Sequence, residues 1–576
     1  MVRADALVHA RVCAFDSCVA SNMSTFAAAV KTNVDPVGRK AMLSHPLRDD
    51  FIAGEHLEWD SLLGAGHMHL RDRPEKPHGA HVGRAHWVYK ERPGDNVQPA
   101  CGRSRLVYDK ACYGSGAPDS ATVFGDLPTY CPSQAWDTTC TMFALKVQYN
   151  LFCIGCDVRQ AYLNAKLPEG KGYWAELPKD RQADHPGKLL YFSSGIYGAD
   201  PSGRAWFDTN MCGMAEDINL RPLKIEPTLA VRSDENGTIL VGINTDDGII
   251  LATSQKLLDD FQTYYNSKYE VRWGSINRYS GVNVTIDDEH NTVSLDQSDF
   301  IEKVWHKWRD RVAPSRRGGA RGVGFPNLPA RADLEALTSP QALAANNASD
   351  ALRREYKQCV GDASWYANRC RKDCLPACSM LGKALDKPSE ELLQRAIEMH
   401  AFAFATNDRK ITYSKSTFNE PVAFSDANLG THRSQTGFLI YLANAPVICV
   451  SQAQRCVVLS SCEAEIVAMS ACACAVMWLR LLLAETGLAM RLDKPTPIFC
   501  DNTAAITVSE NPISAKQLRH VQRRHFFVQD MVTAGYITVP YVKSDDNLAD
   551  VLTKIISVVP RFEWASAMLR RWSMSL

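Results

Sequence analysis

The stretch that most constrains the fold is residues 239–253, ILVGINTDDGIILAT, in which two acids stand between apolar runs. β-prone apolar residues on both sides predict two strands, but burying the unpaired carboxylates of Asp246 and Asp247 in a strand core would be costly. The acids therefore predict a tight turn between the strands, with Gly248 just beyond it. Carboxylates at a hairpin tip suit a cation such as Mg²⁺, and a plain exposed turn is the alternative.

A site for phosphoryl or nucleotidyl transfer by two metal ions needs acids from separate elements that converge on both cations. Asp157 is the best candidate for the third acid, because it ends the apolar strand predicted for LFCIGCD (151–157). The stretch between Asp157 and Asp246 is long enough for a helix-containing crossover, so we expect the two strands to be neighbours.

The overall composition is that of a large globular protein with several domains. Sixty-four basic and sixty-four acidic residues give zero formal net charge, so any nucleic-acid-binding surface must be local. One such locality is 303–321, where aromatic residues lie among basic ones; a solvated helix end is the alternative. Nineteen irregularly spaced cysteines and no evident signal peptide predict free thiols. The apolar run 466–484 contains Arg480, which predicts a buried helix rather than a membrane span.

A second group of acids lies in the last third of the chain, on elements predicted in the order strand, helix, strand, helix. Acids so placed can converge at one end of a mixed sheet and form a second two-metal site, here for phosphodiester cleavage. A helix cap or a solvated position is the ordinary alternative for any one of them. These acids are Asp426, Glu463, Asp501 and Asp550.

The pattern of apolar, Gly and Pro residues predicts the remaining organisation. The first residues have no clear pattern, and a Gly-, Pro- and Arg-rich stretch interrupts the middle of the chain. The predicted divisions are a poorly ordered segment (1–35), a first catalytic region (36–310), a linker or loop (311–345), a helical region (346–415), a second catalytic region (416–560) and a tail (561–576).

Several stretches of the first region resemble, in order, the reverse transcriptases of copia-type LTR retrotransposons. CDVRQAYLNAKLPEGKGYWAELP (156–178) is similar to their first polymerase motif, and GIYGADPSGRAWFD (195–208) is similar to their SLYGLKQ motif. LVGINTDDGIILA stands where they carry the paired acids. HWVYKERPGDN and RSRLV (103–107) match upstream, and EYKQCVGDASWYANRCRKDC (355–374) matches downstream.

The resemblance implies roles for individual residues. Asp157, Asp246 and Asp247 would be the metal-binding acids of a polymerase palm. Tyr162 would be the aromatic side chain that crowds the 2′ position of the nucleotide, the only sugar position that separates ribo- from deoxynucleotides. Arg103 and Arg105 would be finger residues on the triphosphate, because guanidinium geometry suits phosphate.

Two departures from the family pattern create the expectation of an impaired polymerase. The family has an aromatic residue before the paired acids, where this chain has Asn244 followed by Thr245. Asp200 replaces a Lys, and a carboxylate near the template would oppose a phosphate.

The last third resembles the ribonuclease H domain of the same elements, through SDANLG, VLSSCEAEIVA, PIFCDNTAAI and NLADVLTK. All four acids of the second group match. Glu463 would be the ligand, and Glu465 would be a neighbouring acid that does not bind metal.

The expected fold is therefore an α+β and α/β multidomain chain: a right-hand polymerase with fingers, palm and a reduced thumb or connection, then a mixed-sheet ribonuclease H domain. The resemblance implies RNA-directed DNA polymerase and ribonuclease H activities with two Mg²⁺ ions per site, or Mn²⁺. Its partners would be an RNA template, a DNA primer, an RNA–DNA hybrid, dNTPs and other polyprotein parts (capsid, integrase), with no membrane. The expected location is intracellular, in cytoplasmic virus-like particles and/or the nucleus. The alternatives are a degenerate or co-opted copy that only binds nucleic acid, or one that is only a ribonuclease H.

Overall fold

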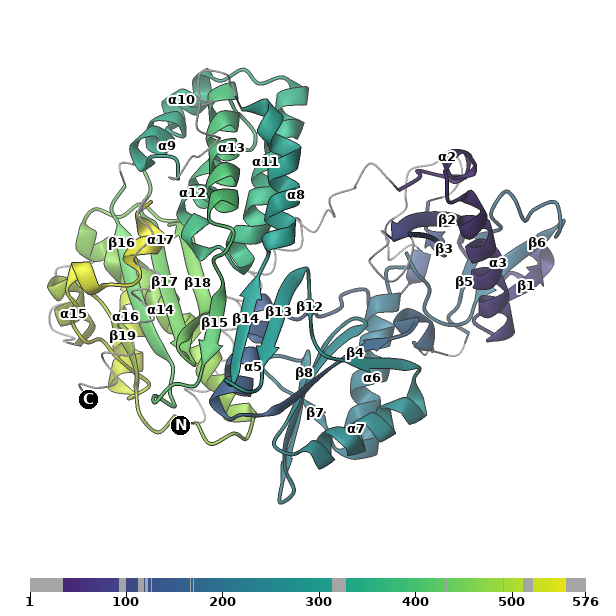
Figure 1. Cartoon of the computed structure of the whole chain (residues 1–576), viewed down its shortest axis with the longest axis horizontal. Helices are drawn as coiled ribbons and strands as arrows, with labels where there is room; N and C mark the ends of the chain where they lie inside the picture. Colours follow the sequence, from purple (N-terminus) through teal and green to yellow (C-terminus); the bar gives the residue numbers. More distant parts are fainter. Residues whose placement is uncertain are drawn as a thin grey trace.

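The computed structural model describes residues 35–92, 100–111, 119, 123–125, 127–165, 167–168, 170–312, 328–430, 432–490, 492–510 and 522–555. The described residues form four β-sheets and a helical layer (Figure 1). This is the multidomain α+β and α/β fold that the sequence predicts. The segments predicted to be poorly ordered at the start and to form a tail at the end lie outside the described residues, except Asp35.

The fingers unit is a five-stranded sheet in the order β1-β6-β5-β2-β3, with α2 (Arg39–Leu43) and α3 (Arg48–Gly64) beside it. It stands apart from the C-terminal part of the molecule, at the right of Figure 1. The long hairpin of β2 and β3 carries alternating buried and exposed residues, as expected for a sheet with one solvated face. The strands are β1 (Met68–Asp72), β2 (Val82–Arg92), β3 (Cys101–Asp109), β5 (Tyr173–Glu176) and β6 (Lys188–Phe192).

The palm unit is a six-stranded sheet in the order β11-β4-β10-β9-β8-β7. The predicted neighbourhood of the two acid-bearing strands is confirmed, because β10 pairs with β4, and the pairing is antiparallel. The strands are β4 (Phe152–Val158), β7 (Arg221–Pro222), β8 (Leu229–Asp234), β9 (Gly237–Asn244), β10 (Asp247–Ala252) and β11 (Val271–Gly274).

Both faces of the palm sheet are covered, which explains why its strands read as continuous apolar runs. Ile250 of β10 packs in a cluster with α6 (Ser202–Ile218) and α7 (Gln255–Lys268). Ile249 and Leu251 point the other way, into a cluster that includes α5 (Trp136–Gln148).

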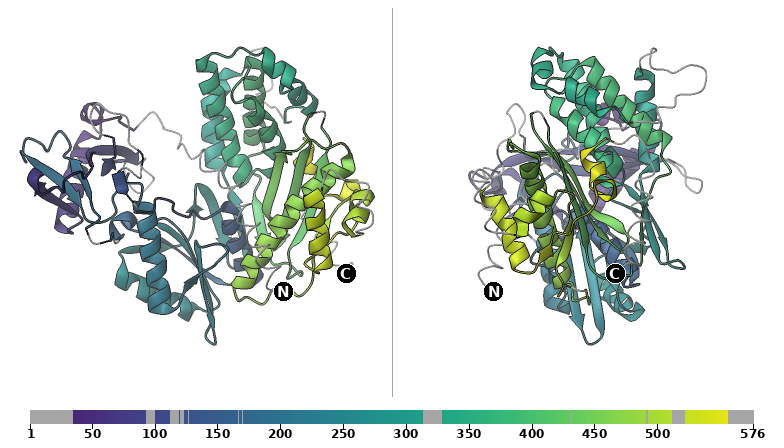
Figure 2. Two further views of the ribbon diagram at one scale, coloured as in Figure 1. Left: turned by 180° about the vertical axis from the view of Figure 1, so that it is seen from behind. Right: turned by 90° about the vertical axis from the view of Figure 1, so that its left-hand side faces the viewer.

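A third sheet combines three strands that follow the palm strands with one strand that comes just before the C-terminal unit. Its order is β12-β13-β14-β15, from β12 (Arg278–Tyr279), β13 (Val282–Asp287), β14 (Thr292–Asp296) and β15 (Ile411–Ser414). β14 pairs in antiparallel register with β15, more than one hundred residues later. The helical unit is the insertion between those two strands, and it packs above this sheet (Figures 1 and 2).

The helical unit contains the helices predicted for 349–406 and, before them, α8, η3, α9 and α10. Its helices are α8 (Ser298–Trp308), η3 (Arg309–Arg311), α9 (Arg331–Leu337), α10 (Pro340–Ala345), α11 (Asp350–Arg369), η5 (Lys372–Cys374), α12 (Leu375–Leu381), η6 (Gly382–Ala384) and α13 (Glu390–Ala405). The prediction of a linker up to residue 345 is wrong for α9 and α10. Leu334 of α9 is fully buried in the helical core, and Ser339 caps α10.

The aromatic residues of α8 are part of the same core, so they are not exposed among the basic residues as a nucleic-acid-binding surface would require. Trp305 and Trp308 are buried, and Lys307 pairs with Asp362 at 2.7 Å. This supports the alternative of a helix end for the described part of 303–321, which stops at residue 312.

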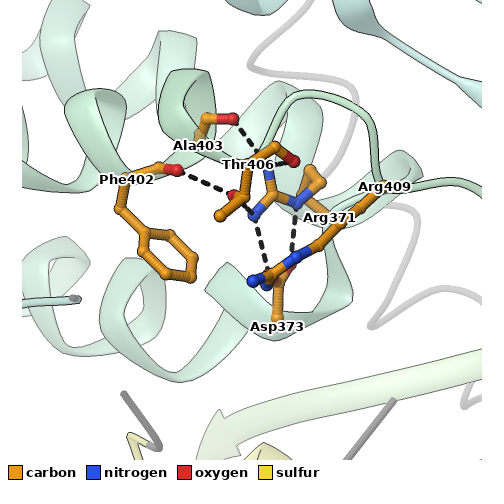
Figure 3. Close-up of polar contacts among 6 residues, drawn as sticks. All are labelled: Arg371, Asp373, Phe402, Ala403, Thr406 and Arg409. Atoms are coloured by element: carbon orange, nitrogen blue, oxygen red, sulfur yellow. Dashed lines mark hydrogen bonds and ion pairs between the residues drawn. The ribbon is translucent and has the colours of Figure 1, made fainter. Parts of the chain in front are cut away.

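A buried ionic network ties the helical unit to the strand that leaves it (Figure 3). Asp373 accepts hydrogen bonds from Arg371 at 2.7 and 3.0 Å and from Arg409 at 2.7 Å. Arg371 also donates to the carbonyl of Ala403 at 2.8 Å and to Thr406, where α13 ends. The cation therefore satisfies carbonyls at a helix C-terminus, where the helix dipole favours positive charge.

The C-terminal unit is a five-stranded mixed sheet in the order β18-β17-β16-β19-β20. α14 and α16 pack together, with α14 on β16 and β17, and α12 and α17 approach β17 and β18. Its elements are β16 (Val422–Asn428), β17 (Gln435–Leu442), β18 (Ala445–Ala453), α14 (Ser461–Glu485), β19 (Thr496–Phe499), α15 (Thr503–Glu510), α16 (Gln522–Thr533), β20 (Ile537–Thr538), η8 (Ser544–Asp546) and α17 (Asp550–Thr553).

By length and composition, α14 is long and apolar enough to span a membrane, yet 83% of its most apolar stretch is buried inside the protein. Arg480 is buried too, and donates to Thr496 and to two backbone carbonyls. α14 is thus the central helix of this unit, as the interrupting Arg predicts.

Candidate active sites

The first candidate site lies at the end of the palm hairpin. Asp247 begins β10 and stands directly opposite Asp157 of β4, and Asp246 lies in the turn. All three acids are exposed, whereas the residues that follow Asp247 are buried. The apolar strands thus support the acids without enclosing them, which resolves the conflict in the sequence.

Two contacts fix the turn itself. Thr245 adopts a left-handed conformation with φ of 62°, which is unusual for a β-branched residue. The indole of Trp206 donates to the Thr245 carbonyl at 2.6 Å, and the backbone N–H of Val158 donates to the Asp246 carbonyl at 2.8 Å. Gly248, which follows Asp247, must be Gly, because a Cβ at this position would lie 2.5 Å from the Cys156 sulfur.

The electrostatics of the three acids are those of a site that favours cations. Partial burial, and then the charges of Asp246 and Asp157, raise the pKa of Asp247 to about 6. Burial and Asp157 also raise the pKa of Asp246, while Arg105 and Arg103 lower it. The positive charges of the two arginines therefore act on Asp246.

Tyr162 and the two arginines reach this site from the neighbouring elements. Tyr162, in η2 (Ala161–Asn164), hydrogen-bonds with Thr245 and packs edge-to-face on Tyr197, with ring centroids 5.7 Å apart. The Arg105 guanidinium lies over the Tyr197 ring, 4.7 Å from its centroid. Sequence reasoning did not assign Tyr197, although it lies in the quoted GIYGADP motif.

The departures from the family pattern have partners in the structure. The Asn244 side chain donates to the Ser280 hydroxyl at 3.1 Å, which ties the hairpin to the turn between β12 and β13. Asp200 forms an ion pair with Lys110 at 2.7 Å. The carboxylate that was expected to oppose a phosphate is therefore at least partly neutralised.

The second candidate site lies at the end of the C-terminal sheet. Asp426 of β16, Asp501 just after β19, and Asp550 at the start of α17 have carboxylate oxygens within 4.8 Å of one another. In the described part of the chain, this group and an overlapping one of Glu465, Cys500 and Asp501 are the two in which three potential ligand atoms lie this close together. Three of the four predicted acids are thus brought together.

The predicted role of Glu463 is wrong. Its carboxylate accepts from the backbone N–H of Leu459 at 2.5 Å, and so it caps the start of α14. Glu465 faces the other acids instead and accepts from the Ala427 backbone N–H at 3.1 Å. Residues two apart on a helix point about 200° away from each other, so only one of them can face the site.

The pKa values of two of the C-terminal acids are raised strongly. Burial, followed by the charge of Asp426, raises the pKa of Glu465 to about 9. Burial is also the main cause that raises the pKa of Asp426 to about 6, and a hydrogen bond from Thr553 opposes it. Lys554 pairs with Asp550 at 2.7 Å and supplies a cation at the edge of the cluster. Four carboxylates with one ammonium fit a hard, oxygen-preferring divalent cation.

A known protein family matches the region of the chain that contains the first site. Residues 72–310 match the family described as Reverse transcriptase (RNA-dependent DNA polymerase). This range contains all six residues predicted for the first site, but none of the C-terminal acids.

Two plant polyproteins are similar to the chain. The Retrovirus-related Pol polyprotein from transposon TNT 1-94 of Nicotiana tabacum is 22% identical over 541 residues, covering 92% of this chain and 39% of that protein. The Retrovirus-related Pol polyprotein from transposon RE1 of Arabidopsis thaliana is 24% identical over 406 residues, covering 70% of this chain and 26% of that protein. The chain therefore spans well under half the length of these relatives.

Among solved structures, one similar protein is a foamy viral protease-reverse transcriptase in complex with double-stranded DNA. Its TM-score is 0.44 at 11% sequence identity, covering 86% of this chain and 70% of that chain.

Proposed function

Residues 72–310 form a reverse transcriptase domain of the copia type, and from this premise we propose that the chain is an RNA-directed DNA polymerase that also cleaves RNA in RNA–DNA hybrids. The observation that carries the polymerase proposal is the pairing of Asp157 with Asp247 beside Asp246, with Arg103, Arg105 and Tyr162 grouped around them. The cluster of Asp426, Glu465, Asp501 and Asp550 carries the nuclease proposal.

In the polymerase site, Asp157, Asp246 and Asp247 would hold two divalent cations, Mg²⁺ or Mn²⁺. When bound, these ions supply positive charge at the attacking and leaving oxygens of the phosphoryl group. Arg103 and Arg105 bind the triphosphate of an incoming dNTP, and Tyr162 excludes a 2′-OH by its bulk. Tyr197 supports both functions, because it touches Arg105 on one side and Tyr162 on the other.

In the nuclease site, Asp426, Glu465, Asp501 and Asp550 would hold the same kind of ion. Lys554 and Thr553 hold Asp550 and Asp426 in place. The proposed partners are an RNA template with a DNA primer, the resulting hybrid, and the capsid and integrase parts of a longer polyprotein. The proposed location is intracellular, in cytoplasmic virus-like particles and/or the nucleus.

The polymerase proposal is tested by extension of a primed RNA template with dNTPs and Mg²⁺. Asp246→Asn should abolish extension, and Asp260→Asn, an exposed acid on α7, should leave it unchanged. Absence of extension by the unaltered chain, or equal extension by Asp246→Asn, would contradict the proposal.

The nuclease proposal is tested separately with a labelled RNA–DNA hybrid. Asp501→Asn should abolish cleavage, and Asp545→Asn, an exposed acid of η8 outside the cluster, should not. A chain that is only a ribonuclease H is the second candidate, because close mutual packing of three ligand atoms is found only among the C-terminal acids in the described residues. Cleavage without extension would select it, and duplex binding with neither activity would select a binding module.

A further inference from the structure

We propose that Arg369 is a phosphate-binding residue for the primer–template duplex, presented by two tryptophans where the helical unit meets the palm. This inference rests on the proposed function and adds to it a duplex contact that none of the residues assigned from the resemblance or from the acid clusters supplies.

The Arg369 guanidinium is held between two aromatic rings. Its central carbon lies 4.6 Å from the ring centroid of Trp136, at the start of α5, and 4.8 Å from that of Trp365, one turn earlier on α11. The indole N–H of Trp136 also donates to the Arg369 carbonyl at 3.2 Å. Cation–π contacts of this kind hold a guanidinium in place through its central carbon and do not use its N–H donors, which can bind an anion.

Those donors have no acceptor in the described part of the chain, although the side chain is only partly exposed. Arg371, two residues later, has a structural role, and its donors are occupied by groups of the protein. Its guanidinium is used by Asp373, by Thr406 and by the Ala403 carbonyl. An arginine that is held over two rings, and has no acceptor among the described residues, is suited to an external anion, and a phosphate can accept two parallel N–H bonds.

The position of Arg369 selects the duplex as the source of that phosphate. A Cβ built on Gly281 would lie 3.1 Å from the Trp365 ring, so the ring rests on the turn between β12 and β13. The adjacent Ser280 accepts from Asn244, which comes just before the catalytic turn. Three successive contacts therefore connect Arg369, on the side of the helical unit, with the hairpin that carries Asp246 and Asp247. Arg103 and Arg105, the candidates for the triphosphate, come from the fingers.

The first test measures duplex binding without turnover, in EDTA, over a range of salt concentrations. Each phosphate that a protein neutralises on B-DNA contributes about 0.9 to the slope of log affinity against log salt. Arg369→Gln should lower that slope by about one and weaken binding roughly tenfold at low salt. The control is Lys357→Gln on the same helix, whose ammonium pairs with Asp386; it should leave the slope unchanged.

A second test locates the phosphate. Single methylphosphonate substitutions along each strand remove one backbone charge at a time. At one position, the substitution should weaken binding of the unaltered chain but not of Arg369→Gln. Arg369→Lys keeps the charge and should keep the salt slope, but it loses the two parallel N–H bonds, so the same methylphosphonate should cost it less affinity than it costs the unaltered chain. If the Gln variant does not fold, this difference is the test, and an equal cost in both proteins would overturn the proposal.

The proposal would be overturned if Arg369→Gln kept the salt slope and every methylphosphonate weakened its binding as much as that of the unaltered chain. Arg369 would then have only a structural role, through its contacts with Trp136 and Trp365. A raised KM for dNTP with unchanged duplex affinity would also overturn it, in favour of the triphosphate. Failure of the unaltered chain to bind any duplex would instead refute the proposed function itself.

Discussion

Glu463 and Glu465 are separated by one residue on α14, yet their carboxylates serve different parts of the molecule. Glu463 accepts from the Leu459 backbone at the helix start, and Glu465 accepts from the Ala427 backbone beside Asp426. We therefore expect Glu465→Gln to lower hybrid cleavage by at least about a hundredfold, as removal of a key charge in an active site does. Glu463→Gln should retain cleavage and lose little stability, because the amide oxygen of Gln can still accept from the Leu459 N–H. Initial cleavage rates and melting curves of the two variants check this, and equal rates would contradict it.

The raised pKa of Glu465 predicts a pH-dependent stability in the absence of metal. The folded state holds this proton up to a pKa of about 9, whereas the unfolded chain releases it near 4.5. Between those values the folded state binds more protons, so unfolding becomes easier as pH rises. Glu465→Gln, which mimics the protonated acid, should melt with the unaltered chain at pH 4.5. At pH 8 in EDTA it should melt at least about 2 °C higher, which corresponds to roughly 1 kcal/mol. A melting difference that does not change with pH would contradict this account.

The hydrogen bond between Asn244 and Ser280 predicts non-additive effects on the polymerase. Asn244→Ala and Ser280→Ala each remove the same contact, which links the catalytic hairpin to the next turn. Each should lower primer extension by a similar factor, about fivefold for a contact of roughly 1 kcal/mol. The double variant should lose little more than either single one, because the interaction is already absent. Extension rates of the four proteins check this, and multiplication of the two single losses would exclude the coupling.

The contact of Tyr197 with Arg105 predicts a positioning effect on nucleotide binding. Tyr197→Leu removes the ring on which the guanidinium lies, whereas Tyr197→Phe keeps it. The Leu variant should raise the KM for dNTP about threefold to tenfold, a loss of ~1 kcal/mol from one cation–π contact. The Phe variant should be close to the unaltered chain. Steady-state extension at varied dNTP concentration checks this, and equal KM values for Leu and Phe would rule out the ring contact as the cause.

The buried network around Asp373 predicts a large loss of stability when one partner is removed. Arg371→Met leaves Asp373 with Arg409 as its remaining cation and frees the carbonyl of Ala403. Breaking a buried ion pair costs about 3–5 kcal/mol. The control is Arg353→Met, because the pair of Arg353 with Asp350 is exposed and should contribute less than about 1 kcal/mol. Denaturant unfolding checks this, and similar midpoints for both variants would contradict it.

Local sequence pattern was enough to predict the elements that carry both sites. The apolar runs on both sides of Asp246 and Asp247 predict a hairpin from local sequence alone, because buried strands exclude unpaired charge. The same reasoning places Asp157 at a strand end and Asp426, Asp501 and Asp550 on separate elements, and the structure brings each set together.

The tertiary structure decided what the pattern left open. Both Glu463 and Glu465 suit a helix start, and only the packing of α14 on β16 determines which one faces Asp426. The pairing of β14 with β15, the ordering of α9 and α10, and the acceptor for Asn244 all depend on residues that are distant in sequence. The sequence by itself therefore determined which elements carry the candidate acids, although it gave the ligand role to Glu463 and not to Glu465. The orientation of their side chains was decided by long-range contacts, because a helix or strand does not fix its own rotation against the rest of the protein.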